Sequence, residues 1–134
     1  MTLIYHIAAA ADWEQAQRDG QYTMSTRGVT LAEQGYIHTA TAAQVALVAS
    51  AYYRGVPDLL LLVIDPGRVI PEIRYEPVPG QDLPYPHIYG PLNLDAVIET
   101  RPFDPGSSPG LWGSERGAEE IELEQEQVLG HGFL

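Results

Sequence analysis

The chain of 134 residues contains neither cysteine nor lysine. Without cysteine it has no disulfide bond, no thiolate catalysis and no cysteine-ligated zinc site, and a cytoplasmic protein is expected. Without lysine it cannot form a Schiff base through a side-chain amine. The chemistry of this chain therefore depends on other side chains, among which histidine and carboxylates are the first candidates.

Long hydrophobic runs are also missing. The longest apolar stretch, residues 59–64, has the length of a buried strand and is too short to cross a bilayer. Nothing at the start of the chain resembles a signal peptide. We therefore expect no membrane partner.

Positive charge is scarce. Seven arginines stand against eighteen acidic residues, and the formal net charge is -11. Residues 104–134 contain seven of the acids and one arginine, so the remainder of the chain is acidic as well. A domain that binds nucleic acid needs a basic face to hold phosphates, so we expect a small-molecule or nucleotide ligand and no nucleic-acid partner. The oligomeric state is left open.

The pattern of apolar residues predicts one globular α+β domain over residues 1–103, with a mostly antiparallel sheet and two main helices. Residues 104–134 read as a Pro/Gly/Ser linker followed by an acidic tail. The expected helices cover residues 8–19 and 42–54, with a single helical turn at 30–33. The expected strands cover residues 3–7, 21–25, 36–39, 58–64, 69–75, 88–89 and 96–100, and strand 69–75 is expected to return antiparallel to strand 58–64.

Three histidines, His6, His38 and His87, lie in or beside predicted strands, each close to a tyrosine. They have three interpretations. In the first, each is a partly buried side chain bonded to the backbone, which is common for histidine. The other two require their strands to be neighbours, so that the histidines converge either as ligands of a catalytic metal, or as neutral groups that hydrogen-bond ribose hydroxyls, an amide or a phosphate.

Glu76 ends a predicted strand just before a proline-rich loop. It is either an exposed acid at a strand end or a functional carboxylate. In the second case it would bind a ribose hydroxyl, stabilise a developing cation or act as a base.

A set of short motifs falls in order over about residues 3–99: Leu3-Ile4-Tyr5-His6-Ile7, Trp13 with Ala16, Gly20-Gln21-Tyr22, Gly35-Tyr36-Ile37-His38-Thr39, Gln44, Leu60 to Asp65, Tyr75-Glu76 and Pro86-His87-Ile88-Tyr89-Gly90-Pro91-Leu92. This pattern resembles the DUF952 family, whose function is unknown. The family is related in fold to ADP-ribosyltransferases, including the RNA 2'-phosphotransferases. The resemblance therefore implies a split, mostly antiparallel sheet that holds NAD in a cleft.

The same resemblance implies roles for individual residues. His6 matches a histidine that contacts the nicotinamide ribose, and His38 matches the second motif of the fold. Many of these transferases have a glutamate in the third motif. Here His87 takes that place and Glu76 lies outside the register, which argues against ordinary ADP-ribosylation of proteins.

The resemblance thus predicts an NAD-dependent enzyme that cleaves the nicotinamide–ribose bond. The alternatives are a non-catalytic module that binds NAD, ADP-ribose or another nucleotide, and a metal-dependent hydrolase. The predicted catalytic residues are His6, His38, Glu76 and His87. The predicted NAD-binding residues are His6, Tyr36, His38, Thr39 and Tyr89, and no metal ligand is assigned.

Overall fold

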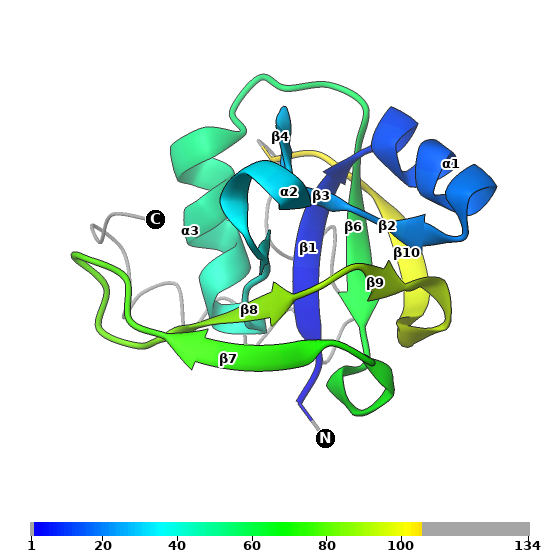
Figure 1. Ribbon diagram of the computed structural model, residues 1–134. Helices are drawn as coiled ribbons and strands as arrows, with labels where there is room; N and C mark the ends of the chain where they lie inside the picture. Colours follow the sequence, from blue (N-terminus) through cyan, green and yellow to red (C-terminus); the bar gives the residue numbers. More distant parts are fainter. Residues whose placement is uncertain (1, 106–134) are drawn as a thin grey trace.

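The computed structural model describes residues 2–105. Two main helices and a set of antiparallel strands make this part of the chain α+β (Figure 1). In chain order the elements are β1 (Ile4–Ala9), α1 (Ala10–Asp19), β2 (Gln21–Tyr22), β3 (Met24–Thr26), β4 (Val29–Thr30), α2 (Leu31–Gln34), β5 (Ile37–His38), α3 (Ala42–Tyr52), β6 (Leu59–Ile64), β7 (Glu72–Glu76), β8 (Tyr85–Tyr89), β9 (Leu92–Asn93) and β10 (Val97–Phe103).

The first three-stranded sheet has the order β1-β6-β10, and both pairings are antiparallel. Its middle strand, β6, is the apolar run of residues 59–64, and five of its six residues are buried. A strand that is covered on both faces needs apolar side chains on both, which explains why this run does not alternate with polar residues.

The second three-stranded sheet has the order β5-β8-β7 and is also antiparallel. It is joined to the first sheet by a β-bridge in which the backbones of Tyr5 and Ala40 exchange two hydrogen bonds of 2.8 Å. On β1 the bridge is next to His6, and on the other side it is two residues beyond the end of β5. Two short ribbons, β2–β9 and β3–β4, complete the strands of the described residues.

Two clusters of buried side chains hold these elements together. One gathers α3 residues such as Val45 and Val48 against Leu61 of β6, and the other gathers Ala16 of α1 with Leu62 of β6 and Ile88 of β8. Figure 1 shows α1 and α3 on opposite sides of β1 and β6. The central sheet is therefore packed on both faces.

Most of the predicted elements are present, with shifted ends. Helix α1 begins at Ala10 because Ala8 and Ala9 pair with β6 as the end of β1. Helix α3 ends at Tyr52, two residues before the predicted end. The predicted turn at residues 30–33 is helix α2, and Thr30 and Glu33 form the capping box that their spacing indicates.

The predicted pairing of strand 69–75 with strand 58–64 is wrong. β7 pairs with β8, because β6 already has β1 on one edge and β10 on the other. A one-turn 3₁₀ helix at Pro66–Arg68 leads the chain away from β6 instead of returning it. Polar residues that alternate along β7 suit this exposed position in the second sheet.

β10 ends at Phe103. The predicted linker and acidic tail lie, apart from residues 104 and 105, outside the described residues, and their separation from the domain stays a prediction. No helix within residues 2–105 has the length and apolar character needed to cross a membrane.

Candidate functional site

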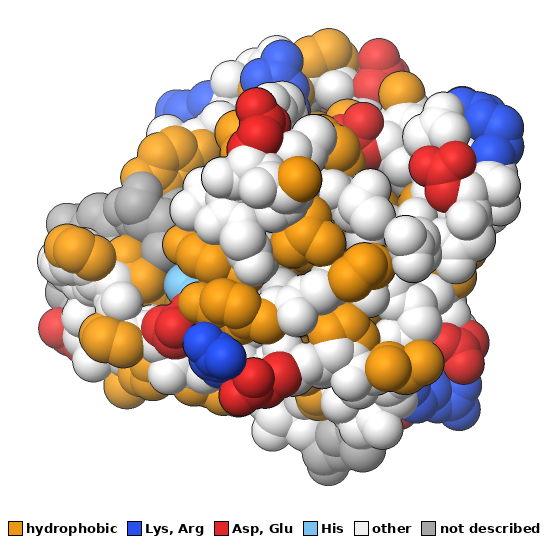
Figure 2. All heavy atoms as spheres, in the orientation of Figure 1, with side chains coloured by type: hydrophobic (Ala, Val, Ile, Leu, Met, Phe, Trp, Pro, Cys, Tyr) orange, Lys and Arg blue, Asp and Glu red, His pale blue; other side chains and the backbone are white. Residues whose placement is uncertain are grey.

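An open cleft of about 650 Å³ lies beside the second sheet. It is lined by the end of α2, by β5, and by the adjoining parts of β7, β8 and the loop after β7: Gln34, Tyr36, His38, Glu76, Pro77, Val78, Pro79, His87 and Tyr89. Figure 2 shows a histidine side chain on this face of the molecule, bordered by hydrophobic and acidic side chains. Five residues predicted as functional thus line one cleft.

The register of the second sheet brings these side chains together. His38 of β5 pairs with His87 of β8, and Arg74 of β7 pairs with His87 from the other side. Glu76 is two residues beyond Arg74 on β7, and Tyr89 is two residues beyond His87 on β8. Side chains two residues apart share a face of a sheet, so this set projects to one side.

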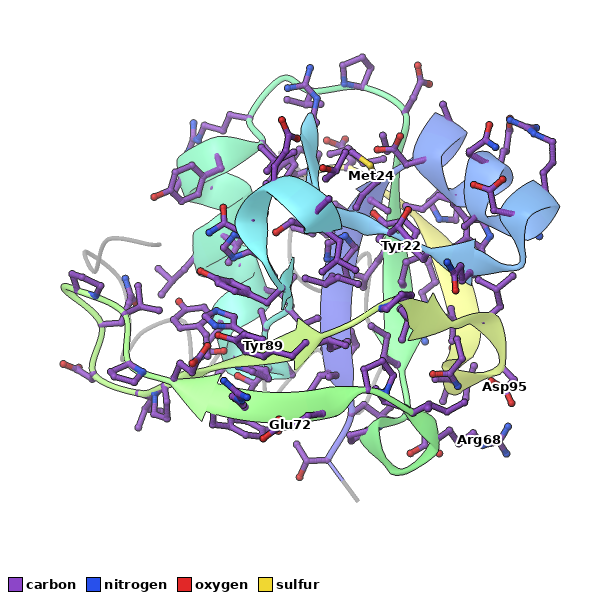
Figure 3. All side chains as sticks on the ribbon, viewed as in Figure 1. Tyr22, Met24, Arg68, Glu72, Tyr89 and Asp95 are labelled. Atoms are coloured by element: carbon purple, nitrogen blue, oxygen red, sulfur yellow. The ribbon has the colours of Figure 1, made fainter. Side chains whose placement is uncertain are left out.

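The side chain of Tyr89 on β8 contacts side chains of the neighbouring strand β7. Figure 3 labels Tyr89 and Glu72, which lie on these two strands. The guanidinium of Arg74 lies 4.2 Å from the ring centre of Tyr89, and the Tyr89 hydroxyl donates a hydrogen bond of 2.6 Å to Glu76 Oε1. Arg74 also donates to Glu72, at 3.0 Å.

Glu76 is held as an ionised carboxylate. The hydrogen bond from Tyr89 is the main cause that lowers the pKa of Glu76, and the bond from His87 Nδ1, at 2.7 Å, adds to it. Both bonds use Oε1, and among the described residues no group bonds Oε2. The Glu76 side chain is 32% exposed, so Oε2 can accept from a ligand in the cleft.

Three aromatic rings form the wall beside this carboxylate. Tyr36 stacks on His87 with ring centres 4.1 Å apart and an interplanar angle of 21°. His38 meets both rings edge-on, at 5.0 Å from Tyr36 and 5.5 Å from His87. Burial, together with the neighbouring His87 and His6, lowers the pKa of His38 to about 4. The His38 ring is therefore neutral at pH 7.

His6 is absent from the cleft lining and lies behind it. Its side chain is 3% exposed, and its Nδ1 donates to the backbone carbonyl of His38 at 2.5 Å. Its Nε2 accepts from the hydroxyl of Tyr22 at 2.8 Å. Burial lowers the pKa of His6 to about 4 and raises the pKa of Tyr22, so both groups are neutral. In this arrangement His6 fixes the backbone that carries His38.

Thr39 is also outside the cleft lining. Its side chain is buried, and its hydroxyl donates to the carbonyl of Pro86 at 2.6 Å. With His6 it borders a small pocket of about 20 Å³, which has room for little more than one water molecule. Thr39 joins β5 to β8, next to the paired histidines.

The histidines converge without forming a metal site. Within residues 2–105 no group of three or more histidine, aspartate or glutamate side chains is placed to hold a metal ion. The His38 ring meets the His87 ring edge-on, while both nitrogens of His6 are bonded to protein atoms.

Sequence reasoning missed several residues around the site. Tyr22 is the partner of His6, and its place in the Gly20-Gln21-Tyr22 motif was the available signal. Gln34 precedes Gly35, whose φ of 96° ends α2 and turns the chain toward Tyr36. Pro77, Val78 and Pro79 line the cleft from a loop that carries no chemical motif.

Comparison with known proteins agrees with the motif pattern. The family model described as "Protein of unknown function (DUF952)" matches residues 7–100, a range that includes His38, Glu76 and His87. The crystal structure of protein CC0527 from Caulobacter crescentus is similar, with 28% sequence identity and a TM-score of 0.68, over 77% of this chain and 87% of that chain. The solution NMR structure of CC0527 gives 30% identity and a TM-score of 0.62, over 78% and 86% of the two chains. A comparison with curated proteins finds no match. The chain belongs to the DUF952 family.

Proposed function

We propose that this protein binds NAD in the cleft between α2, β5, β7 and β8 and cleaves its nicotinamide–ribose bond. The observation that carries the proposal is the ionised Glu76, held by Tyr89 and His87 at the edge of the stacked Tyr36 and His87 rings. Cleavage of this bond develops positive charge on the ribose. A fixed carboxylate beside a ring-binding wall is suited to stabilise that charge.

The cleft suits a nucleotide in size and in lining. Its volume of about 650 Å³ falls in the range typical of small-molecule sites. The faces and edges of Tyr36 and Tyr89 offer stacking surface to a planar ring. Glu76 Oε2 can accept a hydrogen bond from a ribose hydroxyl, and the neutral His38 ring lies close by.

The arrangement of the two antiparallel sheets also supports a relation to the ADP-ribosyltransferase fold. They are linked at the Tyr5–Ala40 bridge, and the candidate site lies on the second sheet just beyond it. In this proposal His6 and Thr39 act from behind the site, because His6 fixes the backbone of His38 and Thr39 fixes that of Pro86. Such support differs from the direct ribose contact that the family resemblance implies for His6.

A second candidate is a module that binds NAD or ADP-ribose without cleaving it. The Tyr36–His87 stack favours it, since a rigid aromatic wall is sufficient for binding a planar ring. Nicotinamide release separates the two candidates.

The test is a calorimetric titration with NAD and with ADP-ribose, with nicotinamide measured in the same samples. Glu76→Gln is the informative variant, and Glu72→Gln is its matched control. Both replace a glutamate of β7 and remove one negative charge, but Glu72 is absent from the cleft lining. We expect Glu76→Gln to lower the rate of release by about 100-fold or more, and Glu72→Gln to change it by less than about twofold.

Each other result has a defined meaning. Binding of NAD without release establishes the second candidate. No binding of either ligand at millimolar concentration rejects both. Equal release by the two variants rejects the role of Glu76.

A further inference from the structure

His87 is held by Glu76 as a carboxylate–imidazole pair. The Nδ1 of His87 donates to the ionised Glu76 Oε1 at 2.7 Å. Because a carboxylate accepts but does not donate, Nδ1 carries a proton, and when the ring holds one proton its lone pair lies on Nε2. This is the way in which a carboxylate orients a histidine that serves as a base.

The Nε2 of His87 is buried without a partner. The His87 side chain is 3% exposed, and within residues 2–105 no group hydrogen-bonds this nitrogen. Two other buried side-chain atoms, Ser25 Oγ and Gln81 Nε2, also have no hydrogen-bond partner among the described residues, but neither residue lines the cleft. Buried polar atoms are nearly always paired, so an unpaired imidazole nitrogen in a residue that lines a cleft favours a bound ligand or water at this atom.

Among the described residues, the lining of the cleft includes no serine, threonine, cysteine or lysine that His87 could activate. The group that meets Nε2 is therefore expected to enter the cleft from solvent. His87 Nε2 has almost no contact with solvent, and the rings of Tyr36 and His38 lie close to the His87 ring. A reactant that reaches this nitrogen has to be small.

We infer that the Glu76–His87 pair is a general base that activates a water molecule, so that the reaction is hydrolysis of NAD rather than ADP-ribosyl transfer to a macromolecule. This inference rests on the proposed function. The bond between ribose C1′ and the nicotinamide nitrogen breaks, and its electron pair neutralises the positive charge of the nicotinamide ring. The water oxygen bonds to C1′, and its proton moves to His87 Nε2 and then to solvent. The products are nicotinamide, ADP-ribose and a proton.

The experiment measures all products of NAD turnover by the full chain, alone and with millimolar agmatine as a guanidinium acceptor. We expect nicotinamide and ADP-ribose in equal amounts, no agmatine adduct and no label on the protein itself. His87→Gln and Glu76→Gln should each lower kcat by about 100-fold or more, since general-base catalysis contributes on this scale. Glu72→Gln should behave as the parent in both kcat and the Kd for NAD.

A second measurement does not depend on NAD. Ring ¹⁵N chemical shifts of the singly protonated His87 ring should place its proton on Nδ1, and Glu76→Gln should weaken that preference. A neutral ring with its proton on Nε2 overturns the inference.

The failures are distinguishable. Undiminished NAD hydrolysis by His87→Gln, or an agmatine adduct in place of ADP-ribose, overturns the general-base inference and leaves the proposed function standing. No nicotinamide release by the parent protein overturns the proposed function and this inference with it.

Discussion

The buried His6 makes the stability of this protein depend on pH in a way that one substitution can isolate. Burial lowers the pKa of His6 to about 4 in the folded protein, against 6.5 for the exposed side chain. Between these two values the unfolded chain binds a proton at this position and the folded chain does not. The free energy of unfolding therefore falls as the pH falls from about 6.5 toward 4.

The size of the effect follows from the number of protons. One proton changes the free energy of unfolding by about 1.4 kcal/mol per pH unit, or about 3 kcal/mol across this window. His6→Gln removes the titration and keeps an amide that can donate and accept. At pH 7 we expect this variant to be less stable than the parent by about 1–3 kcal/mol, because the bonds to His38 and Tyr22 are replaced imperfectly.

The assay is urea unfolding followed by circular dichroism at several pH values between 4.5 and 7. We expect the plot of unfolding free energy against pH to be flatter for His6→Gln than for the parent by about 1 kcal/mol per pH unit. His38 and the carboxylates titrate in both proteins, so the main difference between the two slopes belongs to His6, whose loss also removes one of the lesser causes that lower the pKa of His38. Equal slopes, with equal m-values, would refute the assignment of His6 as a buried neutral group.

Three further outcomes test the fold and the site. Leu62→Ala, in the middle of β6 with no exposed surface, should lower the free energy of unfolding by about 2–5 kcal/mol, and a loss under about 1 kcal/mol in urea unfolding would contradict its place in the core. Gly35→Ala should cost about 1–2 kcal/mol in the same assay, because its φ of 96° is unfavourable for a residue with a Cβ; an unchanged midpoint would be inconsistent with this turn. Tyr89→Phe should raise the pKa of Glu76, followed by ¹³C NMR of the carboxyl carbon, since it removes the largest cause of the lowered value. An unshifted titration would show that the hydroxyl of Tyr89 does not hold Glu76.

The residues that line the cleft and the residues buried behind it use their hydrogen-bonding groups differently. Groups in the open cleft, such as Glu76, keep an oxygen available to a ligand. His6 and Thr39 instead donate hydrogen bonds to backbone carbonyls of β5 and β8. An unpaired buried polar group destabilises the folded state, so the polar atoms of His6 and Thr39 are hydrogen-bonded to protein atoms. His87 Nε2 differs, because it is buried in a residue of the cleft and has no hydrogen-bond partner among the described residues.

Local signals in the sequence determined much of the fold. The apolar run of β6 indicated a strand covered on both faces, and the capping box of Thr30 and Glu33 marked the start of α2. These signals depend on neighbours within a few residues, so one sequence contains them. The motifs around His38 and His87 likewise indicated the family, which the match over residues 7–100 shows.

Only the tertiary structure decided which strands are partners and which histidines line the cleft. β7 pairs with β8 and not with β6, because both edges of β6 are taken by distant strands. His6 and His87 look alike in the sequence, each in a strand near a tyrosine. The pairing of β5 with β8 brings His87 to the cleft. His6 follows the bridge residue Tyr5 on β1, and its side chain is hydrogen-bonded to Tyr22 in the interior. Such choices depend on contacts between residues far apart in the chain, and the residue types alone do not specify them.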